Sequence, residues 1–89
     1  MRTRVMMSQI ALKNLAPDGT VDARNLLCPM PILKAESGMM PLKRGEILAV
    51  RATDRGIEKD LPAWSDINGH QFLGFIDEPG EKVGLVRKG

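Results

Sequence analysis

The stretch Leu26-Leu27-Cys28-Pro29-Met30-Pro31 decides the fold of this chain, because it marks the junction between a strand and a helix. The residues before it, 20–24, alternate apolar and polar side chains, which is typical of a strand with one buried face. Proline is favoured at the start of a helix, and the residue before a proline is driven out of the helical region. Cys28 is therefore predicted at or just before the N-cap of a helix.

The residues after this junction predict one helix, a buried strand and a second helix. The first helix is expected from about Pro31 to Met40, with Met39 and Met40 in the core, and Pro41 ends it. Residues 46–52 are apolar enough for a well-buried strand. Thr53 or Asp54 is expected to cap the helix that follows, since a short side-chain oxygen satisfies free N–H groups.

The second helix is predicted from a stripe of large apolar side chains that ends at Asn68-Gly69, a left-handed stop. The stripe consists of Ile57, Leu61, Trp64 and Ile67. Pro62 lies within it and is expected to kink or restart the helix. Residues 70–77 and 82–87 are then two apolar strands, joined as a hairpin around 78–81.

This order of elements, βαβαββ, predicts the α/β class. Two helices cannot cover both faces of a four-stranded sheet, so we expect a two-layer α/β sandwich, a four-stranded mixed sheet with both helices on one face. With 89 residues the chain is one domain. We assign residues 18–89 to that domain and interpret residues 1–17 as a flexible N-terminal extension.

Charge and aromatic content argue against nucleic acid as a partner. Aromatic residues make up 3% of the chain, whereas single-stranded nucleic acid is usually stacked on aromatic side chains. The formal net charge of +2 comes from the extension, which carries Arg2, Arg4 and Lys13 and no acid. The domain itself is not basic, so direct nucleic-acid binding is not expected.

The cysteine count restricts the remaining classes. One cysteine excludes an intrachain disulfide, and one cysteine with one histidine does not make a structural zinc site. No apolar run approaches transmembrane length, so no membrane is expected as a partner. These features predict a cytoplasmic protein without a cofactor of its own.

Cys28 is the residue best placed for chemistry. A helix N-terminus stabilises a thiolate, whereas Pro29 and Pro31 each remove an N–H donor, so we expect a moderate reduction of the thiol pKa. The alternative is a buried cysteine that serves as a small apolar side chain. The framing prolines favour the functional interpretation. No general base is evident nearby in the sequence, and His70 is interpreted as a histidine at the rim.

The same residues resemble the TusA/SirA family of sulfur carriers. The resemblance covers about residues 20–88 and rests first on residues 21–31, which match the family pattern D-x-R-G-L-x-C-P-x-P. Asn25 stands where the family commonly has glycine, and asparagine also tolerates a positive φ. Later landmarks match in order: Arg44-Gly45-Glu46, Thr53-Asp54, Asp60-Leu61-Pro62-Ala63-Trp64 and Gly69-His70.

The resemblance implies the same βαβαββ sandwich and a carrier that is closer to a co-substrate than to an enzyme. By position Cys28 would accept sulfane sulfur from a cysteine desulfurase or a rhodanese, hold it as a persulfide and pass it to a protein acceptor. Pro29 and Pro31 would frame it, and Arg24, Lys34 and Asp54 are candidate partner contacts. Family uses include tRNA thiolation, molybdenum-cofactor synthesis and sulfur oxidation.

Two other classes stay open. A monothiol redox protein related to glutaredoxins also begins a helix with Cys-Pro after a strand, and glutathione-dependent disulfide reduction would reveal it. A protein-binding or regulatory module could keep the fold without thiol chemistry, and then Cys28→Ser would retain full function.

Overall fold

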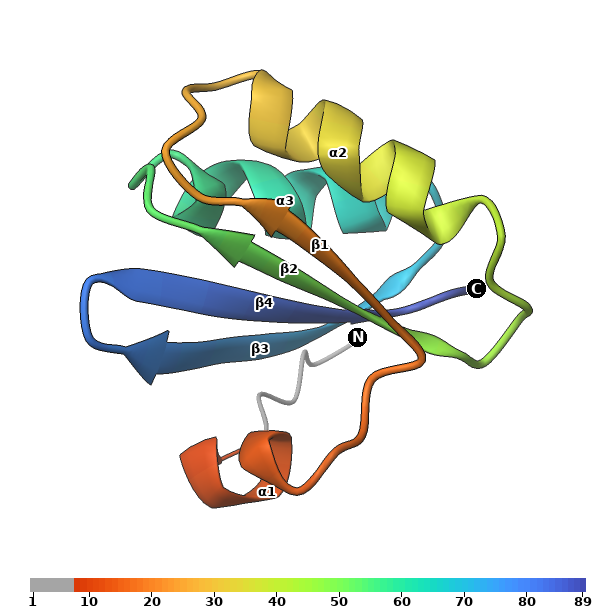
Figure 1. The fold of residues 1–89 in the computed structure, drawn as a ribbon. Helices are drawn as coiled ribbons and strands as arrows, with labels where there is room; N and C mark the ends of the chain where they lie inside the picture. Colours follow the sequence, from red (N-terminus) through yellow and green to blue (C-terminus); the bar gives the residue numbers. More distant parts are fainter. Residues whose placement is uncertain (1–7) are drawn as a thin grey trace, which may run out of the picture.

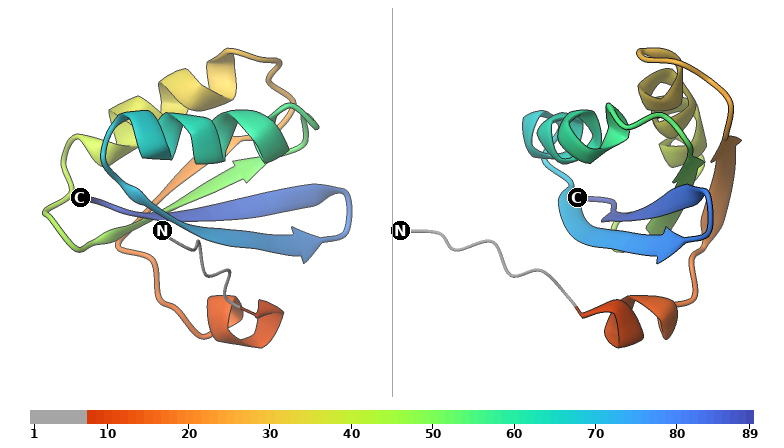
Figure 2. Two further views of the ribbon diagram at one scale, coloured as in Figure 1. Left: turned by 180° about the vertical axis from the view of Figure 1, so that it is seen from behind. Right: turned by 90° about the vertical axis from the view of Figure 1, so that its left-hand side faces the viewer.

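The computed structural model describes residues 8–89 and contains one four-stranded sheet with helices on both of its faces (Figure 1). The strands are β1 (Gly19–Ala23), β2 (Ile47–Ala52), β3 (Gln71–Glu78) and β4 (Glu81–Arg87). Helices α2 (Met30–Met39) and α3 (Ile57–Ile67) form the second layer. The predicted two-layer α/β sandwich is confirmed, and a short additional helix, α1 (Gln9–Lys13), lies beneath the sheet (Figure 2).

The sheet is mixed, with the strand order β1-β2-β4-β3. β1 and β2 are parallel, in a register that pairs Ala23 with Ala52, and the other two pairings are antiparallel. Parallel neighbours need a crossover connection, which α2 supplies. The carboxyl ends of β1 and β2 therefore lie side by side at one edge of the sheet.

The main core lies between the helix layer and the sheet. Ala35 and Met39 of α2 and Leu61 and Trp64 of α3 are buried there against strand residues such as Val50. The tilted contact between the rings of Trp64 and His70, with centroids 5.2 Å apart, closes one end of this layer. Trp64 and Met39 are thus core residues, as the apolar pattern predicts.

Two apolar residues at helix ends were placed wrongly by the sequence pattern. Ile67 is 83% exposed and Met40 is 79% exposed. At about 100° per residue, Ile67 is rotated roughly 80° away from Ile57 and off the buried stripe. Met40 is the C-cap that follows the last residue of α2. The helix does not restart at Pro62, as the sequence suggested it could, because α3 is one continuous helix from Ile57 to Ile67.

Lys88 holds the C-terminal end of α2 in place. Its ammonium group donates hydrogen bonds to the carbonyl oxygens of Met39, Met40 and Leu42 at 3.1, 3.4 and 2.6 Å. The carbonyl of Met39 also accepts a hydrogen bond from the amide of Leu42 at 3.1 Å. A lysine at the end of a helix adds donors for the last carbonyls and opposes the negative end of the helix dipole. Because α2 is fixed at this end, its N-terminus has a defined position over the sheet.

Helix α1 covers the face of the sheet opposite α2 and α3. Leu12 is 1% exposed and clusters with Ile47, Ala49, Leu73 and Leu85. The side chain of Gln9 contacts the edge strand β3, donating to the carbonyl of Phe75 and accepting from the amide of Asp77. Helix α1 of the predicted extension is thus packed on the sheet, whereas residues 1–7 lie outside the described residues.

This packing predicts that Leu12→Ala destabilises the fold. Loss of a buried leucine side chain should lower the free energy of unfolding by about 2–5 kcal/mol. The matched control is Ile10→Ala in the same helix, where a side chain that is 76% exposed should change stability by no more than about 0.5 kcal/mol. Urea unfolding of both variants measures the difference, and equal stability would show that α1 does not pack on the sheet in solution.

Candidate functional site

Cys28 lies exposed in the loop between β1 and α2. Pro29 is the N-cap of α2, so the cysteine stands immediately before it, as predicted. The peptide bond between Cys28 and Pro29 is cis. Asn25 has a φ of 64°, the left-handed conformation in which asparagine replaces glycine at low cost. The loop thus turns as the sequence pattern requires.

Two side chains from the loop between β2 and α3 hold the cysteine loop. The hydroxyl oxygen of Thr53 accepts a hydrogen bond from the amide of Asn25 at 2.8 Å. The carboxylate of Asp54 accepts one from the amide of Cys28 at 3.3 Å. The expectation that Thr53 or Asp54 caps α3 was wrong, because Gly56 is the N-cap and makes no side-chain cap bond. Both side chains stabilise the neighbouring loop instead.

Asp60 is the site residue that sequence reasoning missed. The Sγ atom of Cys28 donates a hydrogen bond to Oδ2 of Asp60 at 3.0 Å, although 32 residues separate them in the chain. Asp60 lies in the first turn of α3, which begins beside the cysteine loop because β1 and β2 are parallel. The parallel pairing was the available signal, since helices that follow parallel strands start at the same edge of a sheet.

The helix N-terminus behind Cys28 has no amide left for the sulfur. Met30 donates its amide to the carbonyl of Leu27 at 2.9 Å. The amides of Ile32 and Leu33 both donate to the carbonyl of Pro29, at 3.0 and 3.2 Å. Pro31 has no N–H group at all. The N–H groups expected to stabilise a thiolate are therefore already bonded within the loop.

The environment of the sulfur therefore favours the neutral thiol. The hydrogen bond to Asp60 raises the pKa of Cys28 above its ordinary value, and partial desolvation and the negative charges of Asp60 and Asp54 act in the same direction. The expected reduction of the thiol pKa was wrong, because the sulfur bonds to the carboxylate of Asp60, the negative charge of Asp54 is nearby, and the first amides of α2 are bonded elsewhere.

The hydrogen bonds of Cys28 to side chains of the described residues go to Asp54 and Asp60, and not to Arg24 or Lys34. Arg24 forms an ion pair with Asp22 at 2.8 Å and approaches Glu81 at 4.0 Å. The hydrogen bond from Arg24 holds the pKa of the Asp22 carboxyl well below its usual range. Lys34 is exposed on α2. Of the three candidate partner contacts, only Asp54 touches Cys28.

His70 lies at the edge of the core, as the sequence predicted for this histidine. It is half-buried, its ring lies against Trp64, and its Nδ1 accepts a hydrogen bond from the amide of Gly89 at 3.1 Å. Burial and the nearby charge of Lys88 lower the pKa of His70. These contacts fix the histidine against the end of α3, away from Cys28, so it is not a base for the thiol.

Apolar side chains surround Cys28 along the chain. Leu27 is 75% exposed, Met30 is 44% exposed and Leu33, one turn further along α2, is 47% exposed. Exposed large apolar side chains that gather at one place often mark a surface that contacts another protein. We name Leu27, Met30 and Leu33 the apolar rim of the site.

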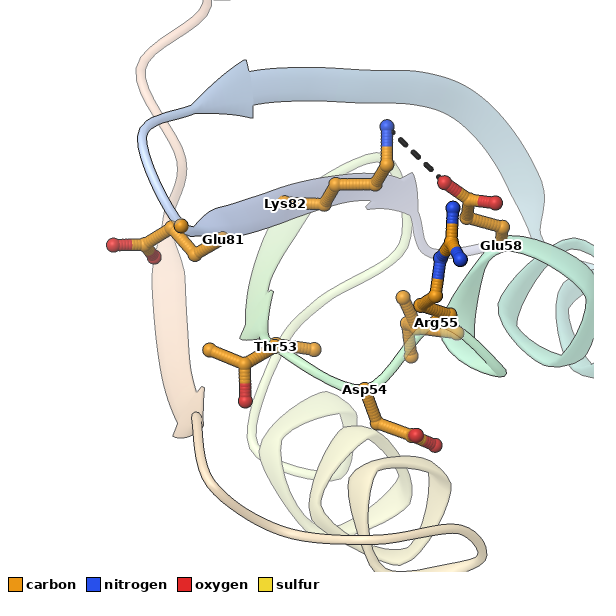
Figure 3. Close-up of a pocket in the computed structure, with 9 residues that line it drawn as sticks. Thr53, Asp54, Arg55, Glu58, Glu81 and Lys82 are labelled. Carbon is orange, nitrogen blue, oxygen red and sulfur yellow. Dashed lines mark ion pairs between the residues drawn. The ribbon is translucent and has the colours of Figure 1, made fainter.

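A cavity of about 340 Å³ lies next to the cysteine loop (Figure 3). It is lined by Thr53, Asp54 and Arg55, by Ile57 and Glu58 of α3 and by the end of the β3–β4 hairpin. The ion pair between Lys82 and Glu58, 3.2 Å long, bridges the hairpin and α3 across it. The cavity therefore shares Thr53 and Asp54 with the contacts that hold the cysteine loop.

Residues 8–89 contain no cluster of three or more histidine, cysteine or acidic residues that could hold a metal ion. Over the same range, no helix has the length and apolar content needed to cross a membrane.

The structure thus places one exposed cysteine between a strand of a parallel pair and the start of a helix, on a two-layer sandwich. The family model described as "Sulfurtransferase TusA" matches residues 19–88, and the chain belongs to this family. The Sulfur carrier protein TusA of Pseudomonas entomophila is 34% identical over 77 residues, which is 86% of this chain and 96% of that protein.

Two proteins of Bacillus subtilis share a higher identity with this chain than the Pseudomonas protein does. YrkI is 48% identical over 72 residues, covering 81% of this chain and 96% of that protein. YrkF is 45% identical over 69 residues, covering 78% of this chain, but this chain spans only 37% of the length of YrkF. The residues matched by the family model include Cys28 and its loop. The same domain occurs within the longer protein YrkF.

The electrostatics of the site predict how the thiol titrates. The rate of alkylation by iodoacetamide should rise with pH to a midpoint that lies higher in the folded protein than in the same protein unfolded in urea. The physical reason is that Asp60 and Asp54 disfavour the thiolate only in the fold. A midpoint in the folded protein below that of the unfolded chain would contradict this geometry.

Proposed function

We propose that this chain carries sulfane sulfur as a persulfide on Cys28 and relays it to a protein acceptor. The observation that carries the proposal is the exposure of this single thiol in a loop fixed by Thr53 and Asp54. A carrier must present its sulfur to two different proteins in turn, and a buried cysteine could not. Membership of the TusA family supports the same assignment.

Loading is an exchange between sulfur atoms. The sulfur of Cys28 attacks the outer sulfur of a donor's persulfide and a new S–S bond forms. The S–S bond of the donor breaks, and its electron pair stays on the donor's cysteine, which takes up the proton that Cys28 loses. In the second step a thiolate of the acceptor attacks the outer sulfur, and Cys28 leaves as the thiolate.

The apolar rim supports direct transfer between docked proteins. Leu27, Met30 and Leu33 leave apolar surface uncovered beside the sulfur. A partner that covers this surface would gain hydrophobic stabilisation and would exclude water from the labile persulfide. The donor class is a cysteine desulfurase or a rhodanese. The acceptor belongs to tRNA thiolation, molybdenum-cofactor synthesis or sulfur oxidation.

The proposal predicts a covalent change that intact-protein mass spectrometry can detect. After incubation with a cysteine desulfurase, pyridoxal phosphate and cysteine, the protein should gain the mass of one sulfur atom, and reductant should remove it. Cys28→Ser should gain nothing. The matched control is Ser37→Cys, which places a thiol on an exposed position of α2 outside the loop.

Combined with Cys28→Ser, the control thiol separates specific loading from chemical transfer. It should not be loaded at the rate of wild type, because it lacks the loop and the apolar rim. If wild type gains no mass with a desulfurase or with a rhodanese, the sulfur-carrier proposal is wrong. A module that binds partners without thiol chemistry is then the better description.

A further inference from the structure

The contact between Cys28 and Asp60 has a consequence for the loading step. Sγ donates to Oδ2 of Asp60 at 3.0 Å, so the proton that must leave the thiol is already shared with a carboxylate. The amide of Cys28 is held at the same time by Asp54. These two bonds fix both the position of the sulfur and the direction of its S–H bond.

Other charged groups around the loop are not placed to take this proton. Arg24, which follows β1, is paired with Asp22, and Lys34 on α2 carries a positive charge. Asp54 from the β2–α3 loop binds the backbone amide rather than the sulfur. Among the residues that the structure describes, Asp60 on α3 is thus the acid that accepts a hydrogen bond from the thiol.

A docked donor makes this contact more important. When a protein covers Leu27, Met30 and Leu33, solvent no longer reaches the thiol freely, and the proton needs an acceptor inside the interface. The fold also favours the neutral thiol, since the pKa of Cys28 is raised by Asp60 and Asp54. Reaction through a thiolate already present in solution is correspondingly disfavoured.

We propose that Asp60 is a catalytic acid–base residue of sulfur transfer, which relays the proton of Cys28 to the donor. This inference rests on the proposed function. As Sγ bonds to the outer sulfur of the donor's persulfide, its S–H bond breaks and the proton passes to the carboxylate of Asp60. The donor's S–S bond breaks, its cysteine leaves with the electron pair, and Asp60 returns the proton to that sulfur.

The relay is balanced and needs no oxidant or reductant. One S–H bond and one S–S bond are broken, and one of each is formed. A carboxylate is a weaker base than a thiolate, so the proton moves as the new S–S bond forms rather than before it. Asp60 is unchanged at the end of the step.

The test compares two reactions of the same thiol in Asp60→Asn. Removal of the negative charge should lower the pKa of Cys28, so alkylation by iodoacetamide at neutral pH should become several-fold faster. Loading from the persulfide of a cysteine desulfurase should become about 100-fold slower, the lower end of the usual contribution of a positioned acid or base. The two rates should therefore change in opposite directions, which a merely structural role of Asp60 would not produce.

Two further variants complete the experiment. Asp60→Glu keeps a carboxylate and should recover part of the loading rate. Asp77→Asn makes the same chemical change in an exposed ion pair with Lys82 on the hairpin and should leave both rates unchanged. Circular dichroism checks that each variant is folded.

Each outcome has a distinct meaning. Faster alkylation with slower loading supports the relay. If both rates of Asp60→Asn rise, Asp60 only suppresses ionisation of the thiol, and the relay is wrong. If neither rate changes, the contact with Sγ has no chemical role. If wild type itself does not load, the proposed function fails, independently of Asp60.

Discussion

The parallel pairing of β1 with β2 is the constraint on which the site depends. It aligns Ala23 with Ala52, so the loops that leave these two strands emerge next to each other. One loop carries Cys28, and the other carries Thr53 and Asp54. These two side chains accept hydrogen bonds from the backbone amides of Asn25 and Cys28, respectively. An antiparallel pairing would send the two loops to opposite edges of the sheet. The cysteine would then lack both its supports and its carboxylate neighbours.

Two features of the site act on the thiol pKa in opposite directions, the helix N-terminus and the neighbouring carboxylates. A helix N-terminus usually stabilises an anion, but here the amides of α2 are bonded to the carbonyls of Leu27 and Pro29. The carboxylates of Asp60 and Asp54 then decide the balance and raise the pKa of the thiol. A carrier with a neutral thiol is slow to react with oxidants and electrophiles, since the thiolate is the reactive form. Its reactivity would depend on a docked partner.

Much of the fold could be predicted from the sequence, because the hydrophobic period changes clearly between strands and helices. The order of the elements, the buried Trp64 and the position of Cys28 before the N-cap follow from local patterns. The positive φ of Asn25 follows from residue chemistry. Ile67 was misplaced because the helical rotation from Ile57 carries it off the buried stripe, and Met40 was misplaced because it lies just beyond the last residue of α2.

The chemistry of the site was less predictable than its position. Cys28 and Asp60 are 32 residues apart, and their contact depends on the register of two strands and on the rotation of α3. The raised pKa of the thiol comes first from its hydrogen bond to Asp60, a contact that the residue types alone do not state. Local sequence thus identifies the candidate nucleophile, whereas tertiary structure identifies the carboxylate that accepts a hydrogen bond from its thiol.

The most direct test of the account follows the sulfur after loading. Protein loaded on Cys28 is separated from its donor and mixed with glutathione, and the products are trapped by alkylation and identified by mass spectrometry. A carrier should give glutathione persulfide and free Cys28, because a sulfur added to the exposed Cys28 would lie further out than Sγ, which contacts Asp60. Release of sulfide with a mixed disulfide on Cys28 would mean attack at Sγ, and would contradict the account of Cys28 as a carrier of transferable sulfur.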